Sequence, residues 1–214
     1  MRKTCSAVQS NGEHGGTTRL LTILVIVGLT AMGAPGSGIA EGVGSPATYQ
    51  IAEVHTLTGE PTGSGGTLVR TRGEVWARFA LSGLEPDAAY SVWWVIWNDP
   101  ALCVDGCGED DLGLPGTAIF YAAGFVTGSD GTANLSVHLE DGPIPIGAES
   151  FTPTNGLRRD NGFGAEIHAI FRTHGPIRVG ETAVQIGTIE AFCDPAVCID
   201  QYGIAFLPTS PAGP

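Results

Sequence analysis

Apolar and polar residues alternate along the chain from residue 48 almost to its end. Between residues 74 and 81 the odd positions are apolar (Val75, Ala77, Phe79 and Leu81), whereas the even positions include Glu74 and Arg78. Residues 132–139 repeat the alternation. A period of two is typical of β-strands that bury one face, and no stretch of about 10 to 12 residues shows the stripe of an amphipathic helix. The pattern therefore predicts an all-β protein.

The same alternation predicts further strands, separated mostly by Gly, Pro, Asp or Ser. The expected strands are 48–55, 67–72, 74–81, 89–97, 118–126, 132–139, 164–172, 183–192 and 202–207. The segment GSDG at 128–131 predicts a tight hairpin turn, and GSGG at 63–66 is interpreted as a loop. Together these elements predict an antiparallel β-sandwich of about eight or nine strands.

One expected strand is apolar on both faces. Ser91, Trp93, Val95 and Trp97 share one parity, and Val92, Trp94 and Ile96 share the other. A sandwich strand normally shows one face to water, so another segment must cover the second face. The candidates are two long irregular loops, 99–117 and 141–163, since loops of this length usually bind a ligand or pack down as a lid. We expect Trp94 in the core and Trp97 under the loops.

The amino-terminal segment has the pattern of an export signal. Residues 20–34 are apolar, Arg19 precedes them and small residues follow. The run is shorter than the roughly 20 residues of a membrane span, and cleavage after Ala40 fits the small-residue rule best. An uncleaved anchor is the alternative. The expected organisation is a signal peptide (1–40), one β-sandwich domain (41–207) and a disordered tail (208–214), with no stable membrane span after cleavage.

Charge narrows the range of partners. After residue 40 the chain carries seven arginines, no lysine and 21 acidic residues, a net charge of −14. Such a surface repels phosphate backbones, and the arginines are scattered rather than gathered in a basic stripe. The sequence therefore argues against nucleic-acid binding.

Four cysteines remain after removal of the expected signal, and they form two tight pairs. Cys103 lies four residues before Cys107, and Cys193 lies five residues before Cys198. An even number of cysteines in an exported chain predicts disulfides, each short ring contributing about 2 kcal/mol on the chain-entropy model. In a cytosolic protein the same spacing would suggest a zinc site. We expect local pairing within each pair.

Two segments carry a resemblance to known proteins. YSVWWVIWNDPALCVDGCGEDDLG (90–113) and GAEIHAIFRTHGP (164–176) resemble a group of uncharacterised secreted bacterial β-rich proteins, over about residues 75–206. The resemblance implies export and a β-rich fold, and no activity. Histidines, β-strands and a cysteine-bearing loop also invite comparison with copper-zinc superoxide dismutases. That comparison fails because the chain has no HxH pair.

The first candidate metal site is the acidic loop around the first cysteine pair, with Asp99, Asp105, Glu109, Asp110 and Asp111. Hard oxygen ligands on an irregular loop suit calcium, which is the one cofactor the sequence suggests. No EF-hand spacing is present. A solvated acidic loop is the alternative interpretation.

The second candidate metal site is the pair Glu166 and His168. Alternate residues of a strand lie about 6.6 to 7 Å apart on one face, so both side chains could reach one metal, with His138 or His174 as a further ligand. The alternative is a cross-strand ladder of Glu, His and Arg172 on an outer face. The chain has no GxSxG elbow, Walker A loop, GxGxxG after a strand, HExxH or paired glycosidase motif.

Aromatic side chains offer a third kind of site, because their faces stack on sugar rings and apolar ligands. The candidates are Trp76, Trp93, Trp94, Trp97, Phe120 and Tyr121. Packing in the core is the alternative interpretation for most of them. Trp93, Trp97 and Asp99 are the expected ligand-binding residues, since they lie next to the long loops.

The sequence thus favours an exported, non-enzymatic β-sandwich that binds a small molecule, a glycan or a surface protein through loops 99–117 and 141–163. A metal-dependent secreted enzyme using Glu166, His168 and the acidic loop is the first alternative. A structural component of an envelope or matrix is the second.

Overall fold

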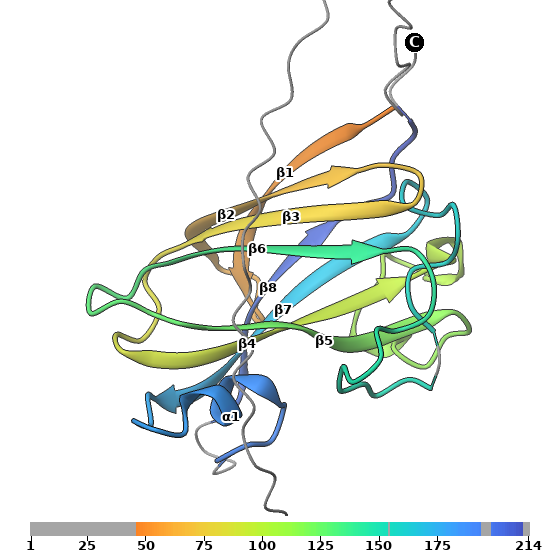
Figure 1. Ribbon diagram of the computed structural model, residues 1–214. Coiled ribbons are helices and arrows are strands. Elements are labelled where there is room, and N and C mark those ends of the chain that lie inside the picture. The colour runs from red at the N-terminus through yellow and green to blue at the C-terminus, as the bar shows by residue number, and fades with distance from the viewer. Residues whose placement is uncertain (1–45, 154, 194–197, 212–214) are drawn as a thin grey trace, which may run out of the picture. The chain divides into compact units, whose positions relative to one another are not determined.

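The computed structural model describes residues 46–153, 155–193 and 198–211 (Figure 1). The expected signal peptide and its cleavage site lie outside these residues. The elements in chain order are β1 (Thr48–Thr56), β2 (Pro61–Arg70), β3 (Glu74–Leu81), β4 (Ala88–Trp97), two 3-10 turns (Pro100–Leu102 and Glu109–Asp111), β5 (Thr117–Val126), β6 (Ala133–Glu140), β7 (Glu166–Pro176), α1 (Thr182–Gly187) and β8 (Asp200–Phe206). No helix in this part of the chain is long and apolar enough to cross a membrane.

All eight strands belong to one antiparallel sheet, in the order β5-β4-β7-β8-β1-β2-β3-β6. The edge strands β5 and β6 are consecutive in the chain and approach each other, so the sheet is nearly closed (Figure 1). The predicted all-β antiparallel class and strand number are confirmed. The two layers that face each other across the core are the two halves of this single curled sheet.

The predicted turn at 128–131 joins the two edge strands. The Gly131 N–H donates to the Gly128 carbonyl (3.0 Å), and Asp130 Oδ1 accepts from the N–H and hydroxyl of Thr132. Gly131 has φ +70°, and a Cβ there would lie 2.4 Å from the Leu84 carbonyl oxygen. A glycine is therefore required where the chain passes from one edge of the sheet to the other.

Two expectations were wrong. The segment 63–66 is part of β2. Gly65 and Gly66 pair with residues of both neighbouring strands, β1 and β3. The expected strand at 183–192 is instead the short helix α1 followed by turns. The helix packs against β5, where a Cβ on Gly124 would lie 2.3 Å from the Ile186 carbonyl oxygen. The absent side chain lets the helix lie directly on the strand.

The interior of the sheet holds the main hydrophobic core, to which every strand contributes. Its largest fully buried side chains include Trp94, Phe120, Phe171 and Phe206. The inward residues of β4 are Tyr90, Val92, Trp94 and Ile96, as the period of two predicts. Trp94 is 1% exposed, so its expected place in the core is confirmed.

A buried arginine ties the end of β2 to two distant segments. Arg70 is fully buried, and its guanidinium donates to the carbonyls of Gly162 (2.9 Å), Ala165 (2.9 Å), Phe206 (2.8 Å) and Leu207 (3.1 Å), and to Gln50 Oε1. Burial lowers the pKa of Arg70 to about 10, although Glu166 opposes the shift. The side chain thus stays charged at neutral pH and donates to four buried or partly buried carbonyls, of which Leu207 also accepts the Gln50 amide (2.8 Å).

The carboxyl-terminal residues after β8 continue along the sheet as far as they are described. The Thr209 N–H donates to the Phe163 carbonyl (2.9 Å), and the Thr48 hydroxyl donates to the Ser210 carbonyl (3.1 Å). Thr209 and Ser210, in the expected disordered tail, therefore have hydrogen-bond partners in the sheet domain.

Candidate functional site

All ten residues of β4 are buried, although only one face of this strand looks into the core. The outward residues are Ser91, Trp93, Val95 and Trp97. Three separate segments cover them, and two are the long loops that the sequence singled out. The expectation of a covered second face is confirmed, and the cover determines which groups a ligand can reach.

Loop 99–117 covers the carboxyl end of β4. Trp97 and Val95 form a second apolar cluster with Cys103, Cys107 and Leu112. The Trp97 indole N–H donates to the Asp111 carbonyl (3.0 Å), and its ring meets the His168 imidazole edge to face (4.7 Å). Both expected local disulfides are present, Cys103–Cys107 and Cys193–Cys198. The Cys103–Cys107 disulfide keeps loop 99–117 compact where it packs over Trp97.

Loop 141–163 covers the middle of β4 and the edge of β5. The Phe151 ring lies 5.5 Å from the Trp93 ring. Residues 149–151 pair with β5, since the Tyr121 N–H donates to the Glu149 carbonyl (2.9 Å) and the Phe151 N–H donates to the Ile119 carbonyl (3.0 Å). The loop therefore occupies hydrogen-bonding groups that an edge strand would otherwise expose.

The third covering group lies over Ser91 and consists of His174 and the disulfide Cys193–Cys198. The sequence did not predict it. The Trp93 indole N–H donates to Ser91 Oγ (2.9 Å), which lies 2.9 Å from Nε2 of the buried His174. On its other side, His174 Nδ1 lies 3.6 Å from Cys198 Sγ and 3.9 Å from Cys193 Sγ. Among the described residues this is the single cluster of three potential metal ligands. Its two sulfurs are bonded to each other, so the cluster is a packed structural unit here.

Burial lowers the pKa of His174, although the Ala191 carbonyl opposes the shift and Arg172 and Asp200 act in opposite directions. The unfolded chain therefore binds this proton more readily, and the free energy of unfolding should fall as pH drops below about 6.5. We expect His174→Gln to reduce that slope by up to about 1.4 kcal/mol per pH unit. Urea unfolding between pH 7.5 and 5 measures it. His138→Gln is the control, and equal slopes for the two variants would contradict the prediction.

Asn98, the residue after β4, holds the two long loops together. Its amide nitrogen donates to the carbonyls of Gly116 (2.8 Å) and Gly156 (2.9 Å), and its oxygen accepts the N–H of Arg158 (2.7 Å). Asn98 is 5% exposed. A buried amide that uses both donors and its acceptor fixes the relative position of the loops.

A hollow of about 460 Å³ lies at this junction of the loops. Its lining comprises Asn98, Gly116, Gly142, Pro143, Asn155, Gly156, Leu157, Arg158 and Arg159. Arg158 forms a two-pronged ion pair with Asp99, and this pairing holds the pKa of the Asp99 carboxyl below its usual value. Arg159 forms no ion pair with a described residue. Two consecutive arginines thus line a hollow in a strongly acidic chain.

The carboxylates proposed for calcium do not converge on one point. Asp99 pairs with Arg158, and Asp111 Oδ2 accepts the Gly108 N–H (3.0 Å) within the second 3-10 turn. Asp105, Glu109 and Asp110 lie on the same loop, but the cluster of three ligands found among the described residues is elsewhere. Calcium binding by this loop remains a prediction.

Glu166 and His168 lie on the outer face of β7, as predicted, with 2.8 Å between Glu166 Oε1 and His168 Nε2. The other two histidines expected to join them do not. His174 lies beside the second disulfide, and His138 on β6 pairs with Glu74 (2.9 Å). A hollow of about 520 Å³ over β1, β7 and β8 instead brings Glu53 and His55 to the same surface as His168.

The four tryptophans differ in accessibility. Trp93 and Trp97, expected as ligand-binding residues, are each 3% exposed, because the loops cover them. Trp76 on β3 is 47% exposed. It shares the outward parity of Glu74 and Arg78, so the period of two already marked it as the tryptophan that faces water.

Comparison with known proteins yields no family. No family model matches the chain, and no curated protein matches its sequence. A solved structure with a limited likeness is a mutant of a SOD-like protein from Bacillus subtilis, with 12% sequence identity and a TM-score of 0.34. The alignment covers 75% of this chain and 99% of that chain. A likeness at this level carries no argument about site or activity.

Proposed function

We propose that the protein is an exported, non-enzymatic β domain that binds a small carboxylate or phosphate anion in the hollow between loops 99–117 and 141–163. The observation that supports this is the pair Arg158 and Arg159 at the wall of that hollow. Guanidinium groups bind carboxylates and phosphates through paired N–H donors. Asp99 already shows how a carboxylate sits against Arg158.

Rigidity of the site is the second support. Asn98 holds both loops through buried hydrogen bonds, and the first disulfide ring holds loop 99–117 against Trp97. A site already shaped before binding loses less conformational entropy when a ligand arrives. The two local disulfides are consistent with an oxidising, exported environment.

The test is thermal unfolding of the mature domain at constant ionic strength with phosphate, succinate or citrate in place of chloride. We expect at least one of the three to raise the melting temperature, because a ligand that binds only the folded state stabilises it. Arg159→Gln should remove most of that increase. Arg78→Gln, which removes an exposed arginine on a distant strand, should leave it unchanged. No increase with any of the three anions, or an equal increase in Arg159→Gln, would overturn the proposal.

The second candidate is a metal-dependent secreted enzyme. It is favoured by the hollow that places Glu53, His55 and His168 on one surface, with Glu166 paired to His168. Imidazole and carboxylate ligands suit zinc, copper or nickel. Metal analysis of the purified protein separates the two candidates, because stoichiometric transition metal that is lost in His168→Gln supports the enzyme.

A further inference from the structure

The outer face of β1, β2, β3 and β6 carries three rows of residues in register across the strands. Tyr49, Val69, Trp76 and His138 form the first row. Ile51, Thr67, Arg78 and Ser136 form the second. Glu53, Gly65, Ala80 and Asn134 form the third. Neither long loop contributes to these rows, so this face is independent of the hollow between the loops.

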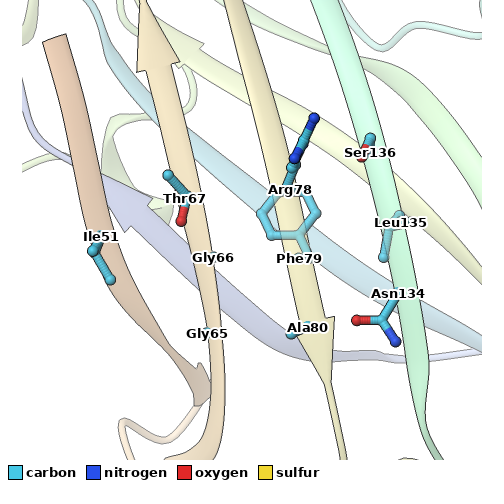
Figure 2. A pocket seen from close by; sticks show the side chains of 10 residues that line it. All are labelled: Ile51, Gly65, Gly66, Thr67, Arg78, Phe79, Ala80, Asn134, Leu135 and Ser136. Atoms are coloured by element: carbon cyan, nitrogen blue, oxygen red, sulfur yellow. The ribbon is translucent and has the colours of Figure 1, made fainter.

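The second and third rows enclose a hollow of about 440 Å³ (Figure 2). Gly65 and Ala80 form the floor of this hollow. The surface is recessed there because neither residue has a side chain larger than a methyl group. Figure 2 shows Thr67, Arg78 and Ser136 side by side on β2, β3 and β6, with Ile51 on β1 and Asn134 below them. The result is a shallow groove with an apolar floor and hydrogen-bonding walls.

Trp76 stands next to this groove in the first row and is held in place. The Trp76 and His138 rings stack with centroids 3.8 Å apart and an interplanar angle of 18°. The His138 Nε2 in turn lies 2.9 Å from Glu74 Oε2. Tyr49, in the same row, is 71% exposed and Ile51 is 86% exposed. Such large apolar side chains, gathered on one face and partly fixed, mark an interaction surface.

The polar side chains that line the hollow are donors and neutral acceptors, since Glu53 of the third row is not among the lining residues. Arg78 offers guanidinium N–H groups and forms neither an ion pair nor a side-chain hydrogen bond with any residue in the described ranges. Thr67, Ser136 and Asn134 each donate and accept. The net charge of −14 disfavours a polyanion as the partner. A chain of neutral sugar rings combines apolar ring faces for Trp76 with hydroxyl groups for these side chains.

We infer that this face binds a neutral polysaccharide, with a sugar ring stacked on Trp76 and neighbouring hydroxyls hydrogen-bonded to Arg78, Asn134 and Ser136. The open groove lets a long chain run across the rows, which are about 6.6 to 7 Å apart along the strands. Stacking of a sugar ring on Trp76 supplies the contact area, and the polar side chains determine the orientation of the bound polysaccharide.

Affinity electrophoresis tests this site with the mature domain in gels that contain a β-glucan, a mannan, a xylan or a galactan. At least one neutral polymer should retard the protein. Trp76→Ala should weaken that retardation at least about tenfold, and Arg78→Gln should weaken it severalfold. Arg159→Gln, in the hollow between the loops, is the matched control and should behave as the wild type. Both test residues are exposed, so the variants should keep the wild-type melting temperature.

Tryptophan fluorescence gives a second readout. Trp76 is the accessible one of the chain's four tryptophans, so a bound polysaccharide should protect the emission from quenching by iodide. Trp76→Ala should remove both the quenching and the protection. The inference is overturned if no neutral polymer retards the protein, if Trp76→Ala binds as tightly as the wild type, or if only an acidic polymer such as polygalacturonate is retained.

Discussion

Replacement of Trp94 by alanine is expected to lower the free energy of unfolding by about 3 to 5 kcal/mol, or to prevent folding altogether. Trp94 is 1% exposed and lies in the core inside the curled sheet, where its neighbours are residues of hydrogen-bonded strands. These strands cannot close the cavity that the truncation leaves. Urea unfolding of the purified variant measures the loss.

Trp97→Ala is the matched comparison, three residues away on the other face of β4. Its ring packs against the disulfide loop rather than against the sheet interior, so the loop can adjust. We expect a smaller loss of stability together with faster protease cleavage within residues 99–117, because the loop loses its anchor. Equal destabilisation of the two variants, without a change in loop cleavage, would contradict this view of the two faces.

Arg70→Met should be the most damaging single change of a charged residue, with a loss of at least about 3 kcal/mol. The substitution keeps the apolar stem but removes the guanidinium donor from the carbonyls of Gly162, Ala165 and Phe206, whereas Leu207 still accepts the Gln50 amide. Arg70→Lys keeps a cation, yet its single ammonium group cannot replace the planar fork, so its stability should be intermediate.

The control for Arg70 is Arg78→Met on the neighbouring strand β3. Arg78 is exposed and has no ion-pair partner among the described residues, so the change should alter stability by no more than about 0.5 kcal/mol. Guanidinium chloride unfolding of the three variants at pH 7 makes the comparison. A finding that Arg70→Met is as stable as Arg78→Met would remove the structural role assigned to the buried guanidinium.

The fold was predictable where a signal is local. Alternation gave most strands and the two-faced character of β4, and short cysteine spacing gave both disulfides. The helix α1 was missed because six residues are too few to distinguish a helical stripe from a period of two. The glycines of β2 were read as a loop, although neighbouring strands hold them in the sheet.

The candidate sites were less predictable because they depend on contacts between distant segments. Arg70 contacts residues 92 to 137 positions away in the sequence. The local pattern of apolar and polar residues therefore could not predict that its side chain is buried. The neighbours of His174 arrive from β4 and from the second disulfide. The outward parity of Trp76 was visible in the sequence. Its stacking partner His138 and the glycine-lined hollow beside it could be identified only once the order and register of the strands were known.

The pairing of β1 with β8 bears on the order in which the domain can form. His55 pairs with Gly203 and Thr56 with Tyr202, so the first and last strands are neighbours in the middle of the sheet. The sheet therefore cannot be completed until nearly the whole chain is available. Contacts at such separation slow folding, because a long loop must close before they form. The two parts of the sheet, β5-β4-β7 and β1-β2-β3-β6, are joined only when β8 enters between them, so the curled sheet closes around its core in one late step.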